Sequence, residues 1–450
     1  MIVRERLRPD VFRLPVEKIR SGYKSDIYFN RTKYVLERDG LHRRSTMQVF
    51  QKNDGVTVVG TDHTLAILHV GTGHYRDRVA AQRLFERYLE NERALYRVWS
   101  ALPGVEWDEY EAVARRIFDT SRALSELWTP AWQELEVRSL FDGESAGARE
   151  TVMHIDGDYA EYAHLETLYL GALTDGSKIA SNTRTVVEAA NGKPVIMFGA
   201  RHQSHEAQAG AGYAAHVGGA IGVSTDEQGE WWGSTGLGTI PHALIAIYGG
   251  DTVLATLKFD EHINRSEEPL AHLTAKENPE GHINVTALVD FQNDVVGTSL
   301  QVAKALGQKL WGVRVDTSED LLDASVLEEI RRERGLARGE LRGVTPRLVE
   351  ILRAALDRNG YPHVKIVASG GFDAAKIRRF EAAGVPVDVY GVGAELLHAG
   401  GAAYDYTADI VRVEGRPLAK VGRAYAENPR LGIVDWQALT GTTRAAKGKR

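Results

Sequence analysis

The hydrophobic and polar positions in the first third of the chain predict short strands followed by two long helices. Residues 1–75 have the pattern of a β-rich region, with strand-like runs at 46–50 and 56–59. Apolar residues recur at helical spacing across 77–101, and Pro103-Gly104 ends that pattern. A second helix is expected next, and one of its faces should pack in the core with Trp107, Tyr110, Ala114, Ile117 and Phe118.

From about residue 150, predicted helices and apolar strands alternate along the chain. The helices are expected at 159–173, 178–190, 347–358 and 374–383. The strands are expected at 195–198, 283–289, 310–315, 364–368 and 387–390. Repeated β–α units with buried strands indicate a parallel sheet, and several such units in a row fit an α/β barrel.

Charged residues and glycines stand where these strands end. They are Arg201, Asp290, Asp316, the pair Gly370-Gly371 and the loop 391–393, while Arg314 lies inside its strand. The carboxyl ends of barrel strands form one face, arginine pairs with phosphate or carboxylate, and glycine loops let backbone N–H groups approach phosphate. A single Gly-Gly pair is as readily an ordinary turn, and a charged strand end an ordinary ion pair. Their coincidence at one face predicts a site for an anionic, phosphorylated ligand.

Composition and charge narrow the class of protein. The chain has 450 residues, 43% of them hydrophobic and 26% charged, which predicts a globular protein of two or three structural units. A net charge of −6 gives no indication of a nucleic-acid partner. The absence of cysteine excludes disulfides, a thiol nucleophile and cysteine-based metal sites. Residues 1–9 do not resemble a secretory signal and no apolar run is long enough to span a bilayer, so we expect a cytoplasmic protein without a membrane partner.

Histidines mark two further positions. His202 and His205 follow Arg201, but without other ligands at metal spacing they are interpreted as polar residues of a loop or helix start, and no protein-bound metal is expected. His242 closes the segment 238–242, where it is as readily a helix cap as a catalytic group. The sequence contains neither a Walker-type phosphate loop nor a Rossmann fingerprint after a first strand.

Several short motifs, taken in their order along the chain, resemble those of nicotinate phosphoribosyltransferases and their nicotinamide-using relatives. The motifs are Asp26-Ile27-Tyr28, Glu166-Thr167-Leu168-Tyr169-Leu170, Phe198-Gly199-Ala200-Arg201, Gly238 to His242, Gly312 to Ser318, Ala368-Ser369-Gly370-Gly371 and Tyr390-Gly391-Val392-Gly393. Each motif is modest by itself, but the ordered set is specific. The resemblance extends from Asp26 to about residue 400.

The resemblance implies an α/β fold with an N-terminal α/β sandwich domain plus an irregular α/β (TIM-like) barrel. The first domain would span 1–145, joined by the C-terminal segment 405–450, and the barrel would span 146–404. The resemblance also implies a homodimer, in which Asp26 and Tyr28 reach into the partner's active site. The implied reaction joins nicotinate to the ribose 5-phosphate of phosphoribosyl pyrophosphate (PRPP), with Mg²⁺ on the pyrophosphate and ATP as a co-substrate.

The family's pattern also implies roles for individual residues. Phe198 and Tyr28 would sandwich the pyridine ring, and Arg314 would hold nicotinate or the reacting ribose. Asp316 would bind the ribose hydroxyls, and Arg201 would serve the carboxylate or the 5′-phosphate. The phosphates would lie against Ser369, Gly370, Gly371, Gly391, Val392 and Gly393.

Other matched positions concern ATP and the choice of substrate. His242 falls where the family has a histidine that ATP phosphorylates, and Thr239 of the same segment is expected to bind substrate. Asp290 matches the first residue of the family's Asp-Thr-Tyr-Asp motif and is expected to be catalytic. Nicotinamide-using relatives have an aspartate at the position of Ser224, so the serine favours the acid as substrate.

The chain departs from the family pattern in two loops. Residues 290–294 and 316–320 differ from the usual motifs, and the second lacks the usual glycine and is one residue longer. Three alternatives therefore stay open: a quinolinate phosphoribosyltransferase, a nicotinamide-using relative, and a catalytically inactive paralogue that binds nucleotide. The retention of Arg201, His242, Arg314 and Asp316 favours an active enzyme.

Overall fold

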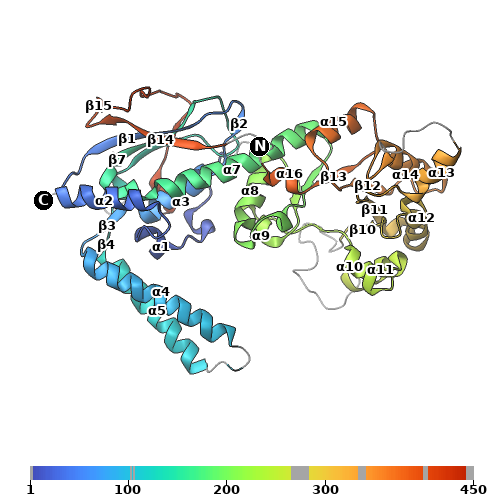
Figure 1. The fold of residues 1–450 in the computed structure, drawn as a ribbon, viewed down its shortest axis with the longest axis horizontal. Coiled ribbons are helices and arrows are strands. Elements are labelled where there is room, and N and C mark those ends of the chain that lie inside the picture. Colours follow the sequence, from blue (N-terminus) through green and yellow to red (C-terminus); the bar gives the residue numbers. More distant parts are fainter. Residues whose placement is uncertain are drawn as a thin grey trace. The chain divides into compact units, whose positions relative to one another are not determined.

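The computed structural model describes residues 4–101, 104, 107–264, 283–332, 341–398 and 404–441. The chain forms two compact units (Figure 1). The first unit comprises Ile2–Ser177 together with Ala403–Arg450, and the second comprises Lys178–Ala402. In the described part of the chain, no helix combines the length and the apolar composition that a membrane crossing requires.

The first unit is built on a six-stranded antiparallel sheet in the order β15-β14-β1-β7-β5-β16. The strands are β1 (Arg44–Gln51), β5 (Glu136–Ser139), β7 (Thr151–Asp158), β14 (Tyr406–Val413), β15 (Arg416–Pro417) and β16 (Gly432–Ile433). Central strand β1 pairs with β7 on one side and with β14, from the C-terminal segment, on the other. Since β7 belongs to this sheet, the first unit continues past the boundary expected at residue 145, as far as Ser177.

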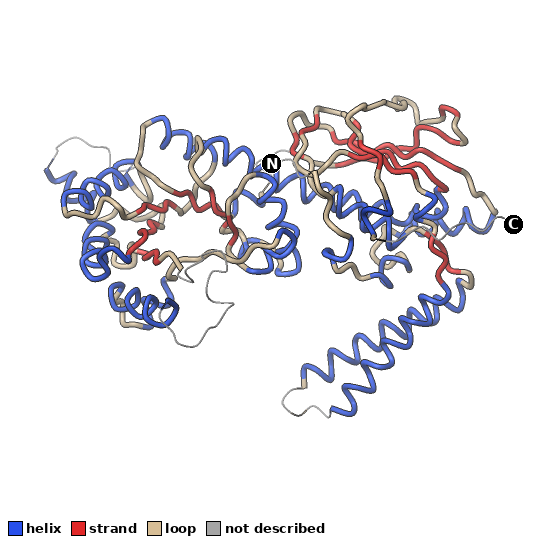
Figure 2. The backbone as a smooth tube through the Cα atoms, turned by 180° about the vertical axis from the view of Figure 1, so that it is seen from behind, coloured by secondary structure: helices blue, strands red, loops and turns tan. Residues whose placement is uncertain are grey.

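Helices α3 (Thr61–Gly71) and α7 (Glu166–Ala189) lie against one face of this sheet (Figure 2). The core between them includes Met47 and Val49 of β1 with Leu68 of α3. Glycines allow close backbone approach here, because a Cβ on Gly176 of α7 would lie 2.8 Å from the backbone oxygen of Val59. Two helices are predicted at 159–173 and 178–190, but the structure has one continuous helix, α7, over most of this range.

The prediction that residues 1–75 are β-rich is wrong for most of that region. Helices and 3-10 turns dominate it: η1 (Pro9–Phe12), α1 (Val16–Arg20), α2 (Ile27–Asp39) and α3. The other short elements of the unit are β2 (Val56–Thr57), β3 (Gly73–Tyr75), β4 (Trp128–Pro130), β6 (Ser145–Ala146), η2 (Trp132–Glu134), α6 (Tyr159–Tyr162), η3 (Ala163–Leu165) and α17 (Trp436–Thr440). Helix α2 is polar on average and exposes Ile27, Tyr28, Tyr34 and Val35, so its sequence has only a weak helical pattern of apolar residues.

Two antiparallel helices, α4 (Arg78–Ser100) and α5 (Trp107–Leu127), extend away from the sheet of the first unit (Figure 1). The helices are as predicted, but the expected core role of the α5 aromatics is wrong: Trp107 is 62% exposed and Phe118 is 65% exposed. Each helix packs mainly on the other, so burial is confined to a narrow stripe that includes Phe85 and Leu124 near the sheet. The periodicity of apolar residues predicted both helices, but it could not predict that most of the α4–α5 pair would extend beyond the core.

The second unit is built on a curled six-stranded parallel sheet, which confirms the expected α/β fold class. Its order is β10-β11-β12-β13-β8-β9. The strands are β8 (Val195–Met197), β9 (Gly222–Val223), β10 (Val285–Leu288), β11 (Leu310–Val315), β12 (Lys365–Ala368) and β13 (Val389–Val392). All five predicted strands lie within this sheet, and their interiors are buried as a parallel sheet requires.

Helices connect these strands in the second unit. They are α8 (Gln208–Gly218), α9 (Asp226–Gly229), α10 (His242–Ile247), α11 (Thr252–Phe259), α12 (Val295–Leu306), α13 (Ala324–Arg332), α14 (Pro346–Arg358), α15 (Ala374–Ala382) and α16 (Ala394–Leu397). Short turns complete the set: η4 (Ala200–His202), η5 (His205–Ala207), η6 (Glu230–Trp232), η7 (Asp260–Asn264) and η8 (Gly307–Lys309). Because the strands are parallel, their carboxyl ends lie at one edge of the sheet, and this edge carries the candidate site.

Candidate active site at the strand ends

Arg314 is the centre of a hydrogen-bonded cluster at the carboxyl edge of the parallel sheet. Its Nε donates to Ser369 Oγ over 2.8 Å, and one terminal nitrogen donates to Thr239 Oγ1 over 3.2 Å. The other terminal nitrogen pairs with Asp316 Oδ2 at 3.1 Å. Ser369 also donates to Asp316 Oδ1 over 2.6 Å, so the four side chains hold one another in place.

The register of neighbouring strands creates this cluster. Arg314 of β11 stands opposite Val367 of β12, and Ala368 ends β12 opposite Val315. Ser369 therefore leaves its strand beside the end of β11, and its backbone N–H donates to the Val315 carbonyl. A one-residue slip would direct the Arg314 side chain to the other face of the sheet, so the pairing of the strands decides the site.

Phe198 places an aromatic ring beside this cluster. The guanidinium carbon of Arg314 lies 4.9 Å from the centre of the Phe198 ring, which is the geometry of a cation–π contact. On the neighbouring strand, a Cβ on Gly391 would lie 2.4 Å from Cε2 of Phe198. Gly391 is therefore needed for ring packing, in addition to the phosphate-binding role that the resemblance implies.

The Ser369-Gly370-Gly371 loop leads from β12 toward α15. Gly370 and Gly371 both have positive φ, at +88° and +62°, which non-glycine residues adopt only with strain. Lys376, in the first turns of α15, donates from Nζ to the Gly370 carbonyl over 3.1 Å. Burial lowers the pKa of Lys376. The sequence interpretation missed this cation, although its position five residues after a Gly-Gly pair is a signal that could have indicated it.

His242 and Asp290 form a second pair at the same edge. His242 begins α10, and its Nε2 lies 3.1 Å from Asp290 Oδ1. Asp290 is largely buried just beyond the end of β10, and burial raises its pKa while the neighbouring His242 opposes that shift. The ring of His242 is 45% exposed, so one nitrogen is oriented by a carboxylate and the imidazole still faces solvent.

Four of the predicted substrate-binding residues lie outside these two clusters. Arg201 is exposed on η4, and no hydrogen bond or ion pair joins it to another described residue. Ser224 follows β9, where its hydroxyl donates to Gln228 Oε1 over 3.1 Å. Asp26 and Tyr28 belong to the first unit, at the start of α2; Asp26 accepts from Thr167 Oγ1 over 2.8 Å, and Tyr28 is 57% exposed.

The altered loop at 290–294 has structural contacts of its own. Asp294 caps α12 by accepting from the Gly297 backbone N–H over 3.0 Å, and Asn293 has a positive φ of 54°. The side chain of Asn293 donates to the Leu322 carbonyl. The changed residues at 290–294 thus stabilise a helix start and a turn, while Asp290 keeps its place at the strand end.

The remaining sequence-predicted phosphate contacts lie beside the same strands. Gly393 follows β13, where an added Cβ would lie 3.0 Å from both Cε1 of His202 and the Phe198 carbonyl. The Phe198 backbone N–H donates to the Val392 carbonyl. His202 therefore packs against the β13 loop, and neither it nor His205 belongs to the one group of three potential metal ligands found among the described residues, which is His42, Asp158 and Glu161.

Comparison with known proteins agrees with this architecture. No protein-family model matches the chain. A nicotinate phosphoribosyltransferase of Mycobacterium tuberculosis, pncB1, is 29% identical over 345 residues, which cover 74% of this chain and 65% of the relative. The Bacillus subtilis nicotinate phosphoribosyltransferase is 24% identical over 277 residues, covering 60% and 46%. The matched segment thus spans less than two thirds of the length of these relatives.

Solved structures extend the likeness to nearly the whole chain. Nicotinate-nucleotide pyrophosphorylase from Pyrococcus furiosus is 27% identical, covers 93% of this chain and 84% of its own, and has a TM-score of 0.63. Human nicotinic acid phosphoribosyltransferase has the same fold, with 17% identity, coverage of 89% and 77%, and a TM-score of 0.54. The fold and the strand-end site therefore define a protein of the phosphoribosyltransferase class. Within that class, these relatives support the nicotinate phosphoribosyltransferase family, which the ordered motifs of the chain also resemble.

Proposed function

We propose that this chain transfers the ribose 5-phosphate of PRPP to nicotinate, forming nicotinate mononucleotide and pyrophosphate. The observation that carries the proposal is the Arg314–Asp316–Ser369 cluster beside Phe198, at the edge where the glycine loops of β12 and β13 also lie. A guanidinium next to an aromatic ring suits a planar ring that bears a carboxylate, and glycine loops suit phosphate.

The reaction requires that the pyridine nitrogen is positioned at the anomeric carbon and that the charge developing on the sugar is stabilised. The lone pair of the pyridine nitrogen forms the bond to the anomeric carbon, and the bond from that carbon to the pyrophosphate oxygen breaks. Pyrophosphate leaves with the electron pair, and no proton has to be transferred. As positive charge develops on the sugar, the Asp316 carboxylate, already oriented by Ser369 and Arg314, is placed to stabilise it.

Magnesium would be held mainly by the substrate. Asp290 and Asp316 are carboxylates of the kind that bind Mg²⁺, but both already have protein partners, His242 for Asp290 and Ser369 with Arg314 for Asp316. The donor set therefore fits an ion that keeps water and pyrophosphate oxygens as its principal ligands. When bound, the ion would neutralise charge on the leaving pyrophosphate.

ATP coupling is a separate part of the proposal. The Asp290 carboxylate accepts a hydrogen bond from Nε2–H of His242, so in the neutral ring the lone pair lies on Nδ1. A neutral imidazole is nucleophilic at neutral pH, and a phosphate on it would add negative charge at the edge where the cation must be held. We infer that His242 is the phosphorylated residue and that ATP drives the synthesis forward.

The substrate test uses competition among three ring compounds. The purified protein is supplied with PRPP, Mg²⁺ and nicotinate, nicotinamide or quinolinate, and pyrophosphate release is measured. We expect the highest kcat/KM with nicotinate, because Ser224 introduces no charge that repels a carboxylate. Equal or greater efficiency with nicotinamide or quinolinate would overturn the substrate assignment, and no release above that of Asp316→Asn with any of the three would support an inactive paralogue.

A further inference from the structure

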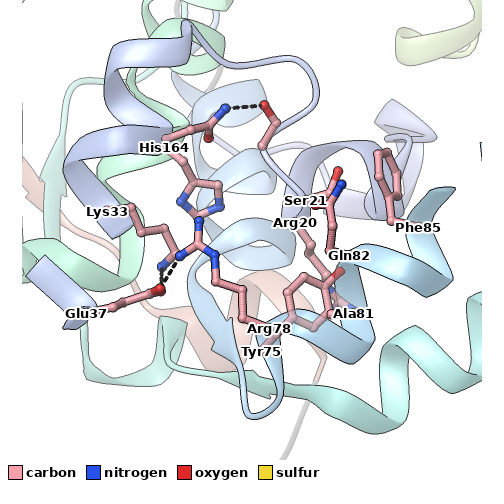
Figure 3. Close-up of a pocket in the computed structure, with 12 residues that line it drawn as sticks. Arg20, Ser21, Lys33, Glu37, Tyr75, Arg78, Ala81, Gln82, Phe85 and His164 are labelled. Carbon is pink, nitrogen blue, oxygen red and sulfur yellow. Dashed lines mark hydrogen bonds and ion pairs between the residues drawn. The ribbon is translucent and has the colours of Figure 1, made fainter. Parts of the chain in front are cut away.

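The first unit contains a cavity of about 60 Å³ that lies among α1, α2, β3, η3 and the start of α4 (Figure 3). None of its lining residues belongs to the strand-end site, and no proposed step of the reaction uses them. On this measure one water molecule needs roughly 10–15 Å³, so the cavity has room for a small polyatomic ligand.

The charged side chains that line this cavity are mostly cationic. They are Arg20, Lys33 and Arg78, with Glu37 as the one carboxylate among the lining residues. Lys33 pairs with Glu37 at 3.3 Å, and Arg78 also pairs with Glu37. Three cations and one carboxylate line the cavity, and two carboxylates outside the lining also act on these cations: Glu161 on Lys33 and Glu17 on Arg20. Figure 3 shows the Lys33–Glu37 pair on one side of the cavity and Arg20 with Tyr75 on the other.

Arg20 has unused hydrogen-bonding capacity. Its Nε donates to the Val70 carbonyl over 2.9 Å, and its guanidinium lies 5.0 Å from the Trp128 ring. The terminal nitrogens of Arg20 have no hydrogen-bond partner among the described residues. Glu17 attracts Arg20 electrostatically, but it bonds to Ser121 and does not line the cavity. Burial lowers the pKa of Arg20, which is the sign of a cation without sufficient compensation.

One further polar group at the cavity lacks a partner. The Tyr75 hydroxyl is buried and makes no hydrogen bond with the described residues. His164 is 1% exposed, and burial, assisted by Lys33 and Arg78, lowers the pKa of His164 well below its usual value, so the ring is neutral and has one N–H. The Gly71 carbonyl faces this ring, although the geometry falls short of a normal hydrogen bond, so His164 is not one of the free donors.

Buried donors without acceptors are costly, and buried cations without anions more so. One ligand would relieve both deficits: a compact anion with several acceptor oxygens. We propose that this cavity binds a single phosphate-sized oxyanion, held by the Arg20 guanidinium and the Tyr75 hydroxyl, with Lys33 and Arg78 supplying additional positive charge. Water could satisfy the donors, but it would bring no negative charge to the terminal nitrogens of Arg20.

Binding of inorganic phosphate tests this site directly. Equilibrium dialysis with labelled phosphate is carried out at constant ionic strength on the full chain and on Tyr75→Phe and Arg20→Gln. A hydrogen bond to a charged group contributes enough that its loss weakens binding roughly tenfold, so Tyr75→Phe should show about that change. Arg20→Gln should abolish saturable binding at this site.

Controls separate this site from the strand-end site and from effects on folding. Tyr88→Phe removes a tyrosine hydroxyl from α4 without altering the cavity lining, so it should bind phosphate as the wild type does. Arg314→Gln alters the strand-end site and should retain the binding event that Arg20→Gln removes.

If Arg20→Gln does not fold, the phosphate affinity of Tyr75→Phe is the test of this site. Saturable binding that is equal in the wild type, Tyr75→Phe and Tyr88→Phe, or its absence from the wild type, would overturn the assignment. These outcomes do not depend on whether the chain makes nicotinate mononucleotide.

Discussion

Arg314 and Ser369 join two neighbouring strands of the parallel sheet, because Nε of Arg314 on β11 donates to Oγ of Ser369, the residue after β12, over 2.8 Å. Ser369 in turn donates a hydrogen bond to Asp316, and Arg314 also forms an ion pair with Asp316. The guanidinium and the carboxylate are thus oriented before any substrate binds. Such preorganisation reduces the reorganisation that the transition state requires.

Replacing Asp316 by Asn should leave the fold intact and remove most of the activity. The amide keeps the size of the side chain but loses the negative charge that faces the developing positive charge on the sugar. Loss of an important transition-state contact of this kind costs ~3 kcal/mol, or roughly a hundredfold in kcat. Circular dichroism and steady-state kinetics check this outcome, and an Asp316→Asn enzyme with wild-type kcat would contradict the assigned role.

Ser369→Ala should lower kcat by about tenfold without unfolding the chain, because Arg314 Nε and Asp316 Oδ1 both lose a partner. Ser299→Ala is a matched control, since it removes a buried hydroxyl that donates to the Val295 carbonyl within α12. Kinetics of both variants are compared at saturating substrate. Equal losses in the two variants would indicate a general effect on the unit rather than positioning of the cluster.

His242 should carry acid-labile, base-stable phosphate after incubation with labelled ATP. His242→Ala should not label, and Asp290→Asn should label more slowly because the imidazole loses the carboxylate that orients it. His205→Ala, a substitution at the start of η5, should label like the wild type. If His242→Ala labels as strongly as the wild type, His242 serves as a structural loop residue.

The stability of the chain should depend on the protonation of Glu166. Its pKa is raised to about 7 from the ordinary value of 4.5, first by burial and then by Asp409 and Asp26. Because the folded pKa exceeds the unfolded one, this stabilising contribution is complete below pH 4.5 and is lost as the pH rises toward 7. Glu166→Gln resembles the protonated form and should be more stable than the wild type at pH 8, by up to about 3 kcal/mol, with little difference at pH 4.

Chemical denaturation at the two pH values measures this difference. Glu188→Gln changes an exposed carboxylate on the same helix and should show no such pH dependence. A Glu166→Gln chain that is less stable than the wild type at pH 8 would show that the charged form of Glu166 is the stabilising one.

Complementation between two inactive variants tests the proposed shared site. Tyr28 is exposed on α2 in the first unit, whereas Arg314 lies in the second. Mixing Tyr28→Ala with Arg314→Ala should restore activity in a dimer whose subunits exchange Tyr28. Random exchange makes half of the dimers hybrids with one intact site each, so recovery should reach about a quarter of the wild-type rate. No recovery after demonstrated subunit exchange would argue for self-contained chains.

The sequence alone predicted the parallel sheet and most of its strand ends. Strand β11 has the predicted bounds, and β12 begins one residue later than predicted. Strand β13 begins and ends two residues later than predicted, so Gly391 and Val392 lie in the strand and not in the loop after it. This success has a local cause, because a buried parallel strand is a continuous apolar run and glycine or aspartate marks its end. The resemblance to a known family then related these strand ends to chemistry.

Only the tertiary structure decided which side chains meet. Arg314 contacts Thr239, which is 75 residues away in the sequence, and the phosphate-sized cavity is lined from five separate elements. The sequence also could not predict that Trp107 and Phe118 are exposed, because a helical pattern shows which face is apolar but not whether another segment covers that face. Periodicity is a property of neighbouring residues, whereas contacts depend on strand register and on the packing of distant segments, and these arise only when the whole chain folds.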